Sequence, residues 1–185
     1  HRLMPFPFRR VAVLFAAAGI AAGSASAQDL ENTLYLDLKD GRVVIEMRPD
    51  VAPNHVARIK ELTREGFYDG LKFHRVIEGF MAQTGDPRGD GTGGSGKKLK
   101  AEFSQVPFER GTVGMARSQS PDSGDSQFFI MFEPSSHLNG QYTVWGQVVS
   151  GMEHVDNIKR GHPAMNGTVQ NPDVIVKMQV AADAD

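Results

Sequence analysis

The 185-residue sequence contains no cysteine. This absence excludes disulfide bonds, thiolate nucleophiles and zinc or iron–sulfur sites with cysteine ligands. The six histidines are scattered, without an HExxH arrangement or a pair at i, i+4 spacing, so they predict no metal site. We expect no metal and no cofactor.

The sequence also lacks a strong excess of charge of one sign. Lysine and arginine number 20 against 22 acidic residues, a net charge of −2. The only locally basic stretch, at 97–100, is short and predicts a solvated loop, so no nucleic-acid partner is expected. Hydrophobic residues at 40% and charged residues at 23% are typical of a soluble globular protein, and the length indicates one domain.

Long hydrophobic runs are absent, apart from one near the start of the chain. Arg9-Arg10 precede an apolar run of about 12 residues, and Ala25-Ser26-Ala27 follow it. This order is typical of a secretory signal, and the run is too short to cross a bilayer, which needs about 20 residues. We expect a signal peptide at 1–27, cleavage after Ala27, and a mature domain at 28–185 in the periplasm, not bound to the membrane. Cleavage would move the net charge from −2 to −5, because residues 1–27 hold three arginines and no acid.

Period-two alternation of hydrophobic residues predicts a mainly β protein. The alternation is clearest at 34–38 and 43–47, on either side of the turn signal Asp40-Gly41, which favours a hairpin. Six more strands are predicted at 73–77, 80–83, 112–116, 127–132, 144–149 and 174–180. Eight short strands favour a closed antiparallel β-barrel, because closure removes exposed edges. Hydrophobic residues that recur every three positions predict two helices, at 53–65 and 152–159, capping the ends of the barrel.

Three other patterns resemble functional motifs. The stretch 91–98 matches the GxxxxGK part of a phosphate-binding loop, but neither a buried strand before it nor a helix after it is predicted. Serines and aspartates at 118–126 suggest a serine hydrolase, but no GxSxG elbow is present. Asn166-Gly167-Thr168 is formally a glycosylation sequon, and Asn-Gly is first of all a turn signal. We interpret all three as loops or turns. The glycine-rich stretch 85–95 is either ordered or flexible.

Two polar residues, Arg75 and Gln83, stand among hydrophobic neighbours. Alternation places Gln83 on the same face of its strand as Met81. Further along, Gln127 and Phe129 share one face of their strand, and the residues that alternate with them face the core. An exposed face that mixes amide, guanidinium and hydrophobic groups predicts a shallow apolar binding groove. The alternative is a half-buried surface strand with one snorkelling arginine.

The same residues fall in blocks that resemble the signature of the cyclophilin family. The blocks are Phe73-His74-Arg75-Val76-Ile77, Gly79-Phe80-Met81-Ala82-Gln83, Gly85-Asp86, Gly91-Thr92-Gly93-Gly94, Gly114-Met115-Ala116, Ser126-Gln127-Phe128-Phe129-Ile130 and Leu138-Asn139-Gly140. The resemblance runs from about residue 34 to residue 180. It implies a cyclophilin-like barrel with peptidyl-prolyl cis/trans isomerase activity, which needs no nucleophile, metal or proton transfer.

The resemblance also implies a role for each matching residue. Arg75 would be the catalytic residue, donating to the prolyl nitrogen of the twisted amide. Gln83 would hydrogen-bond the substrate backbone beside it. Phe80, Met81, Phe129 and Leu138 would line the proline pocket, and Ala116, Arg117 (mainly through its main chain) and Gln127 would hold the residue before proline.

Three positions of the predicted pocket differ from many eukaryotic cyclophilins. His137 replaces a tryptophan before Leu138, Tyr142 replaces a histidine of the pocket wall, and Arg117 replaces an asparagine. The first change predicts only weak cyclosporin binding, while Tyr142 keeps an aromatic wall. These changes resemble those of bacterial cyclophilins.

The expected partners are proline-containing polypeptides, namely exported proteins that are unfolded or folding, and we expect a monomer. An alternative of another class is a proline-peptide binding module or holdase. Such a module would bind peptides without accelerating isomerisation.

Overall fold

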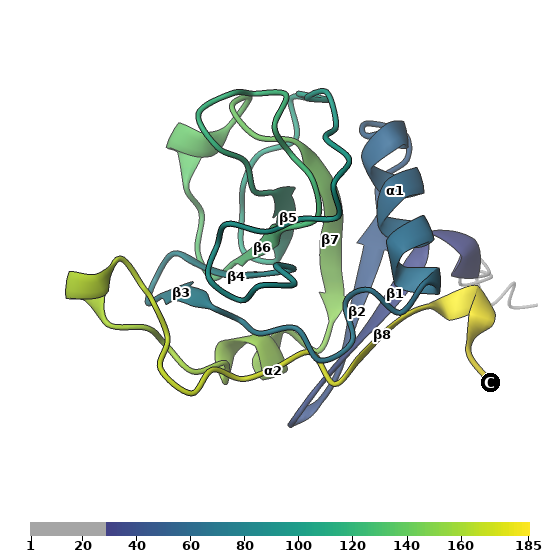
Figure 1. Ribbon diagram of the computed structural model, residues 1–185. Helices are drawn as coiled ribbons and strands as arrows, with labels where there is room; N and C mark the ends of the chain where they lie inside the picture. The colour runs from purple at the N-terminus through teal and green to yellow at the C-terminus, as the bar shows by residue number, and fades with distance from the viewer. Residues whose placement is uncertain (1–28) are drawn as a thin grey trace, which may run out of the picture.

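The computed structural model describes residues 29–185, which form one sheet of eight antiparallel strands with two α-helices (Figure 1). The predicted signal peptide and its cleavage point lie outside the described residues. The strands are β1 (Thr33–Leu38), β2 (Gly41–Met47), β3 (Arg75–Ile77), β4 (Met81–Thr84), β5 (Thr112–Met115), β6 (Phe128–Met131), β7 (Val144–Ser150) and β8 (Lys177–Val180). The helices are α1 (Pro53–Arg64) and α2 (Met152–Asp156), with four short 3-10 helices, η1 (Leu30–Asn32), η2 (Ser136–Leu138), η3 (Pro163–Met165) and η4 (Ala181–Asp183).

The predicted first hairpin is confirmed, with its turn one residue earlier than Asp40-Gly41. Leu38 pairs with Gly41, so Lys39 and Asp40 form the turn. Alternate residues of β1 and β2, among them Leu34 and Leu36, are fully buried. Alternation thus identified the inward face of this hairpin.

The prediction of a closed barrel is wrong, because the sheet is an open half-barrel. Its strand order is β3-β4-β6-β5-β7-β2-β1-β8, with β3 and β8 at the two edges. These edge strands have three and four residues and do not pair with each other. Beside β3 lies the irregular segment around Thr168. Two isolated bridges, Arg75 with Thr168 and Lys72 with Val174, connect the chain near β3 to the segment that leads to β8. A closed barrel would need regularly paired strands between β3 and β8, and irregular segments lie there instead.

Both predicted helices are present and pack against the inner face of the sheet. Proline at the first position of α1 suits a helix start, and Val56, Ile59 and Leu62 on one face enter the main core. α2 ends at Asp156, three residues before the predicted end, although Ile158 beyond it is still buried. Among the described residues no helix is long and apolar enough to cross a membrane.

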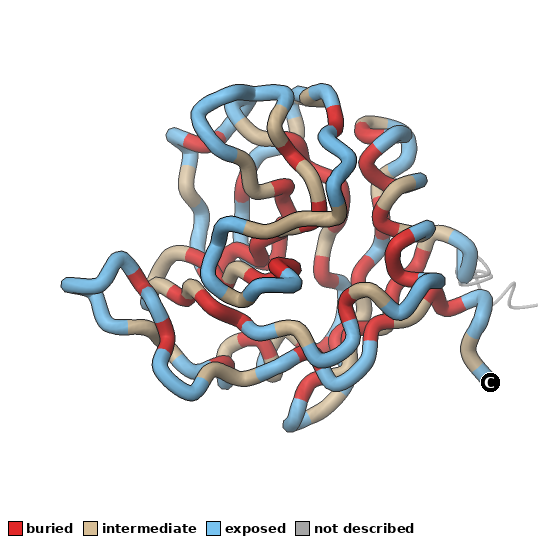
Figure 2. Tube along the Cα trace, viewed as in Figure 1, coloured by how far each residue is buried: buried red, intermediate tan, exposed pale blue. Residues whose placement is uncertain are grey.

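A second hydrophobic cluster lies on the outer face of β4, β5 and β6. Its buried members are Met81, Phe108, Phe129, Met131, Leu138 and Val144. Strands β5 and β6 are buried along their whole length (Figure 2). In β6, Phe128 and Ile130 belong to the main core, while Phe129 and Met131 belong to the outer cluster. The outer cluster supports the site described below.

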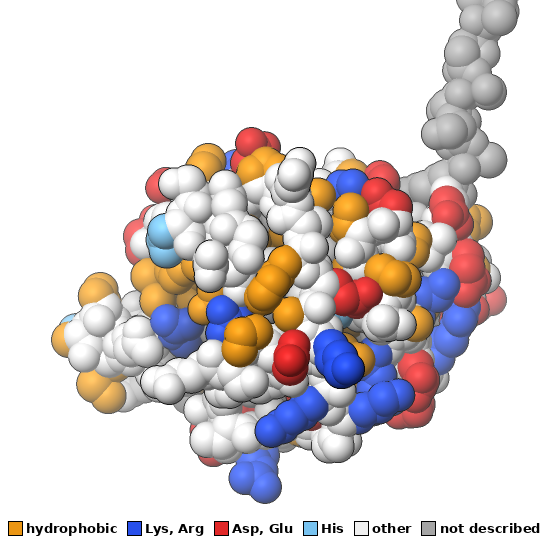
Figure 3. Space-filling view, turned by 90° about the horizontal axis from the view of Figure 1, so that it is seen from above, with side chains coloured by type: hydrophobic (Ala, Val, Ile, Leu, Met, Phe, Trp, Pro, Cys, Tyr) orange, Lys and Arg blue, Asp and Glu red, His pale blue; other side chains and the backbone are white. Residues whose placement is uncertain are grey.

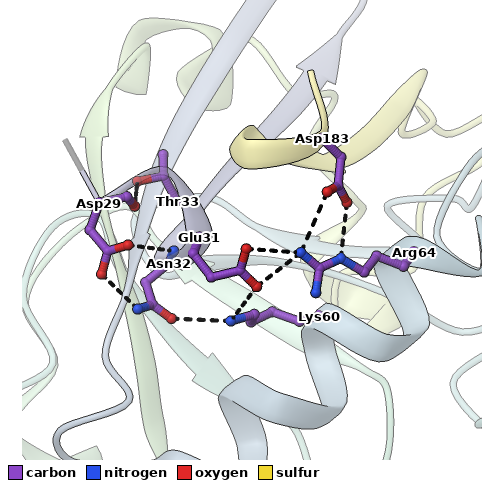
Figure 4. A network of polar contacts seen from close by, with 7 residues as sticks. All are labelled: Asp29, Glu31, Asn32, Thr33, Lys60, Arg64 and Asp183. Carbon is purple, nitrogen blue, oxygen red and sulfur yellow. Dashed lines mark hydrogen bonds and ion pairs between the residues drawn. The ribbon is translucent and has the colours of Figure 1, made fainter. Parts of the chain in front are cut away.

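Both ends of the described chain are fastened to α1 by ion pairs (Figure 4). Arg64 lies 2.9 Å from Asp183 in η4 and 2.9 Å from Glu31 in η1. Lys60 lies 3.0 Å from the same Glu31 carboxylate. Exposed pairs of this kind are each worth little, but together they join η1, α1 and η4.

Candidate active site

An open pocket of about 830 Å³ lies over the outer hydrophobic cluster. It gathers the predicted site residues from five parts of the chain. Those lining it are Arg75, Phe80, Met81, Gln83, Ala116, Arg117, Phe129, His137, Leu138 and Tyr142. The remaining one, Gln127, lines an adjoining hollow of about 320 Å³ with Gln83, Ala116 and Arg117. In Figure 3 hydrophobic side chains gather on the left of the molecule, with lysine or arginine side chains beside them.

Aromatic rings form the apolar floor of the pocket. Phe129 stacks on Phe108 with ring centroids 5.7 Å apart and meets Tyr142 edge-on at 5.7 Å. Phe80 lies 6.1 Å from the ring of His137 at the other side. Packing below fixes these rings, so the pocket presents a preformed apolar surface of the kind that binds small hydrophobic groups.

A chain of hydrogen bonds forms the polar edge of the pocket. Arg75 Nη1 donates to Gln83 Oε1 at 3.1 Å, and Gln83 Nε2 donates to Gln127 Oε1 at 3.0 Å. Gln127 Nε2 then donates to the carbonyls of Gly91 and Gly93 at 3.0 and 2.9 Å. Each amide donates at one end and accepts at the other, which fixes the orientation of both glutamines.

The guanidinium of Arg75 is half-buried at this edge. Burial lowers the pKa of Arg75, but an arginine remains charged at neutral pH. Besides the bond to Gln83, Nε donates to the Asn166 carbonyl at 3.1 Å and Nη2 to Asn166 Oδ1 at 3.2 Å. Three of its five N–H groups are therefore occupied, which leaves two without a partner within residues 29–185. A charged donor with spare hydrogens thus lines an apolar pocket.

Comparison with known proteins agrees with this geometry. A family model described as cyclophilin type peptidyl-prolyl cis-trans isomerase/CLD matches residues 33–180. The chain belongs to the cyclophilin family. A probable peptidyl-prolyl cis-trans isomerase of Brucella suis is 59% identical over 93% of this chain and 94% of its own length. Peptidyl-prolyl cis-trans isomerase B of Bacillus subtilis is 48% identical over 70% of this chain and 92% of its own. The protein is accordingly a peptidyl-prolyl cis-trans isomerase.

Solved cyclophilin structures share the fold. The cyclophilin AquaCyp293 from Hirschia baltica aligns with a TM-score of 0.76 and 28% identity, over 85% of this chain and 76% of that one. A Cryptosporidium parvum cyclophilin, solved in the presence of the dipeptide Ala-Pro, aligns with a TM-score of 0.73 and 26% identity. That alignment covers 80% of this chain and 98% of the other.

Arg117 has a larger side-chain role in this cyclophilin than the sequence predicted. Its guanidinium donates to the carbonyls of Gln141, Ser118 and Gln119 and lies 4.5 Å from the Tyr142 ring centroid. It therefore ties together the two loops that form one wall of the pocket, and its cation–π contact helps to orient Tyr142.

The glycine-rich stretch after β4 is held in place by two carboxylates. Asp86, itself buried, accepts from the backbone N–H groups of Arg88, Asp90 and Gly91. Asp125 accepts from the backbone N–H and hydroxyl of Ser95 and from the next N–H. No helix follows this stretch, in line with its interpretation as a loop and not a phosphate-binding motif.

Sequence reasoning missed several polar residues that line the pocket, and two of them, His74 and Asn166, lie next to or against Arg75. Burial lowers the pKa of His74, and both its ring nitrogens lack a partner among the described residues. Asn166 was interpreted only as part of a turn. The Asn-Gly pair predicted a turn at this place. It did not predict that the turn would lie against Arg75. Within residues 29–185 no three side chains of His, Asp or Glu are gathered as a metal site would need.

Proposed function

We propose that this cyclophilin accelerates Xaa-Pro isomerisation in exported polypeptides and that Arg75 is its catalytic residue. The reaction needs no bond cleavage, since its barrier of about 20 kcal/mol comes from amide resonance. Twisting the amide localises a lone pair on the prolyl nitrogen. A donor that reaches this nitrogen binds the twisted state better than either planar state, which lowers the barrier.

The observation that supports this role is the placement of Arg75. It is a charged donor at the polar edge of the pocket, its guanidinium is oriented by Gln83 and Asn166, and two of its N–H groups have no partner among residues 29–185. The proline ring would occupy the apolar floor, with Phe80, Met81, Phe129 and Leu138 around it. Gln83 would bond the substrate backbone, and Ala116, Arg117 and Gln127 would hold the preceding residue.

The pocket wall suggests how the binding preference differs from eukaryotic cyclophilins. His137 is exposed and hydrogen-bonds Ser135 at 3.1 Å, while Tyr142 is fixed by Arg117. We propose weak cyclosporin binding for this reason. The Ala-Pro dipeptide named with the Cryptosporidium parvum structure supports proline-containing peptides as substrates. We further propose that the protein acts as a monomer without metal or cofactor.

A proline-limited refolding assay tests the catalytic proposal. Arg75→Ala should lower kcat/KM about 100- to 1000-fold, the loss typical of removing one preorganised donor to a transition state. Arg48→Ala is the matched control, because Arg48 pairs with Asp50 and does not line the pocket. Arg75→Ala should keep the thermal midpoint of the wild type. Full activity in Arg75→Ala would refute the role, whereas peptide binding without any acceleration by the wild type would indicate a binding module.

Export is proposed on the basis of the signal-like segment at 1–27. Expression of the whole chain in a Gram-negative host, followed by N-terminal sequencing of the periplasmic fraction, should give a mature start at Gln28. A product that stays in the cytoplasm with residues 1–27 attached would contradict this localisation.

A further inference from the structure

The segment 161–169 runs along the free edge of β3 as an irregular partner strand. The backbone N–H of Val76 donates to the Gly167 carbonyl at 2.9 Å, and the N–H of Gly161 donates to the Val76 carbonyl at 2.8 Å. The N–H of Val169 donates to the His74 carbonyl at 3.1 Å. Gly167 has a φ of 80°, and a Cβ there would lie 2.5 Å from Ile77 Cγ1. The segment is thus fixed on both sides of Arg75.

Asn166 stands at the tip of this segment, against Arg75. Its φ of 53° is left-handed, which asparagine tolerates better than most residues. This conformation lets both its carbonyl and its side-chain Oδ1 accept from one guanidinium, at 3.1 and 3.2 Å. Gln83 binds the same guanidinium from another side at 3.1 Å. The planar group is held from two directions, which leaves it little freedom to rotate.

The side chain of Asn166 has no evident packing role. The residue is exposed, and so are Met165 before it and Thr168 beyond the buried Gly167. Among residues 29–185, Arg75 is the only hydrogen-bond partner of its Oδ1. The bond therefore orients Arg75 and contributes little else.

We propose that Asn166 is a positioning residue for Arg75, which holds the guanidinium at the orientation needed to meet the prolyl nitrogen. The proposal rests on the catalytic role of Arg75. Small misplacements of a catalytic group reduce rates strongly, and supporting hydrogen bonds prevent them. A variant that loses the contact of the Asn166 side chain but keeps the contact of its carbonyl should therefore lose only part of its kcat.

Asn166→Gly is the sharpest variant, because glycine keeps the left-handed backbone and the carbonyl contact and removes only Oδ1. We expect kcat to fall about three- to tenfold, with KM within about twofold of the wild type and the thermal midpoint unchanged. Asn166→Asp, which keeps an acceptor oxygen, should retain at least about half of the wild-type kcat. The matched control is Asn171→Gly, which changes an exposed asparagine with a φ of 50° outside the pocket and should have no effect.

The outcomes separate this proposal from the one on Arg75. If Arg75→Ala keeps full activity, the catalytic role itself fails. If Arg75→Ala is impaired while Asn166→Gly has the wild-type kcat, only the positioning role fails. Equal loss of kcat in Asn166→Asp and Asn166→Gly would also overturn it. In the Arg75→Ala background, Asn166→Gly should cause no further loss, and an additional loss of full size would contradict coupling through Arg75.

Discussion

The two faces of the central strands use similar residues for different purposes. On the inner face of β6, Phe128 is fully buried and meets the rings of Tyr68 and Trp145 edge-on, at 5.4 and 5.3 Å. On the outer face, Phe129 is also mostly buried, but one side of its ring borders the open pocket. Two adjacent phenylalanines thus differ in what lies beyond the ring, which is core in one case and pocket in the other.

Burial alone therefore does not show whether a residue of these strands serves the stability of the fold or the function of the pocket. The residues of the outer cluster are buried nearly as fully as those of the main core. Their packing holds the pocket floor rigid and leaves only its outward side open. The polar edge of the same pocket is rigid for another reason, since its side chains are joined by hydrogen bonds. Three experiments test the contrast.

Phe128→Ala should give the largest effect, and the effect should fall on stability. Removing a fully buried ring leaves a closed cavity, which costs about 3–5 kcal/mol of unfolding free energy. Urea unfolding followed by the fluorescence of Trp145 measures this loss. At a temperature where the variant is folded, its kcat/KM should stay within about twofold of the wild type. A loss of activity per folded molecule comparable with that of Arg75→Ala would show that the two faces are not separable.

Phe129→Ala should act mainly on activity. The space it leaves joins the open pocket and admits water, so its stability loss should be smaller than that of Phe128→Ala. Loss of the apolar surface under the proline ring should lower kcat/KM about 10- to 100-fold, or roughly 1.4–2.7 kcal/mol. Peptide titration beside the isomerisation assay checks the result. Wild-type kcat/KM in this variant would remove Phe129 from the proposed pocket.

The third test concerns the two buried histidines of the described residues, one in α1 and one in the pocket wall. Burial lowers the pKa of His55 in α1, and this outweighs its 2.6 Å contact with Glu102. Burial also lowers the pKa of His74 in the pocket wall. Below about pH 6.5 the unfolded chain therefore binds protons that the folded chain does not, so the free energy of unfolding falls as pH decreases.

The expected slope is at most about 1.4 kcal/mol per pH unit for each histidine. Urea unfolding of the wild type between pH 7 and pH 5 measures it, and His55→Gln with His74→Gln should flatten the dependence. An unfolding free energy that rises as pH falls through this window would contradict the inferred direction.

Alternation predicted much of this arrangement because β6 and β4 obey it. It placed Gln127 and Phe129 opposite the core and set Gln83 beside Met81. Alternation failed at the sheet edges, because a period of two does not show where the pairing of strands stops. The strands expected at 73–77 and 174–180 are β3 and β8, which have only three and four residues. The closed barrel was inferred from strand number alone.

The contact between Arg75 and Asn166 could not be predicted in the same way. The two residues are 91 positions apart, and Asn166 lies in an irregular segment without periodicity. Its path depends on close approaches such as that of Gly167 to Ile77, which follow from the folded backbone. The resemblance that identified Arg75 and Gln83 covers compact blocks of sequence, and this support lies outside them.

The pairing of β1 with β8 has a consequence for how the molecule forms. Leu34, near the start of the described chain, pairs with Val180 near its end, and Arg64 binds both Glu31 and Asp183. Contacts between residues so far apart in sequence form slowly, because a long loop must close first. The first strand has its second neighbour only once the last strand has been made. The sheet can therefore reach its full eight strands only late in synthesis, after residues 177–180 have been made.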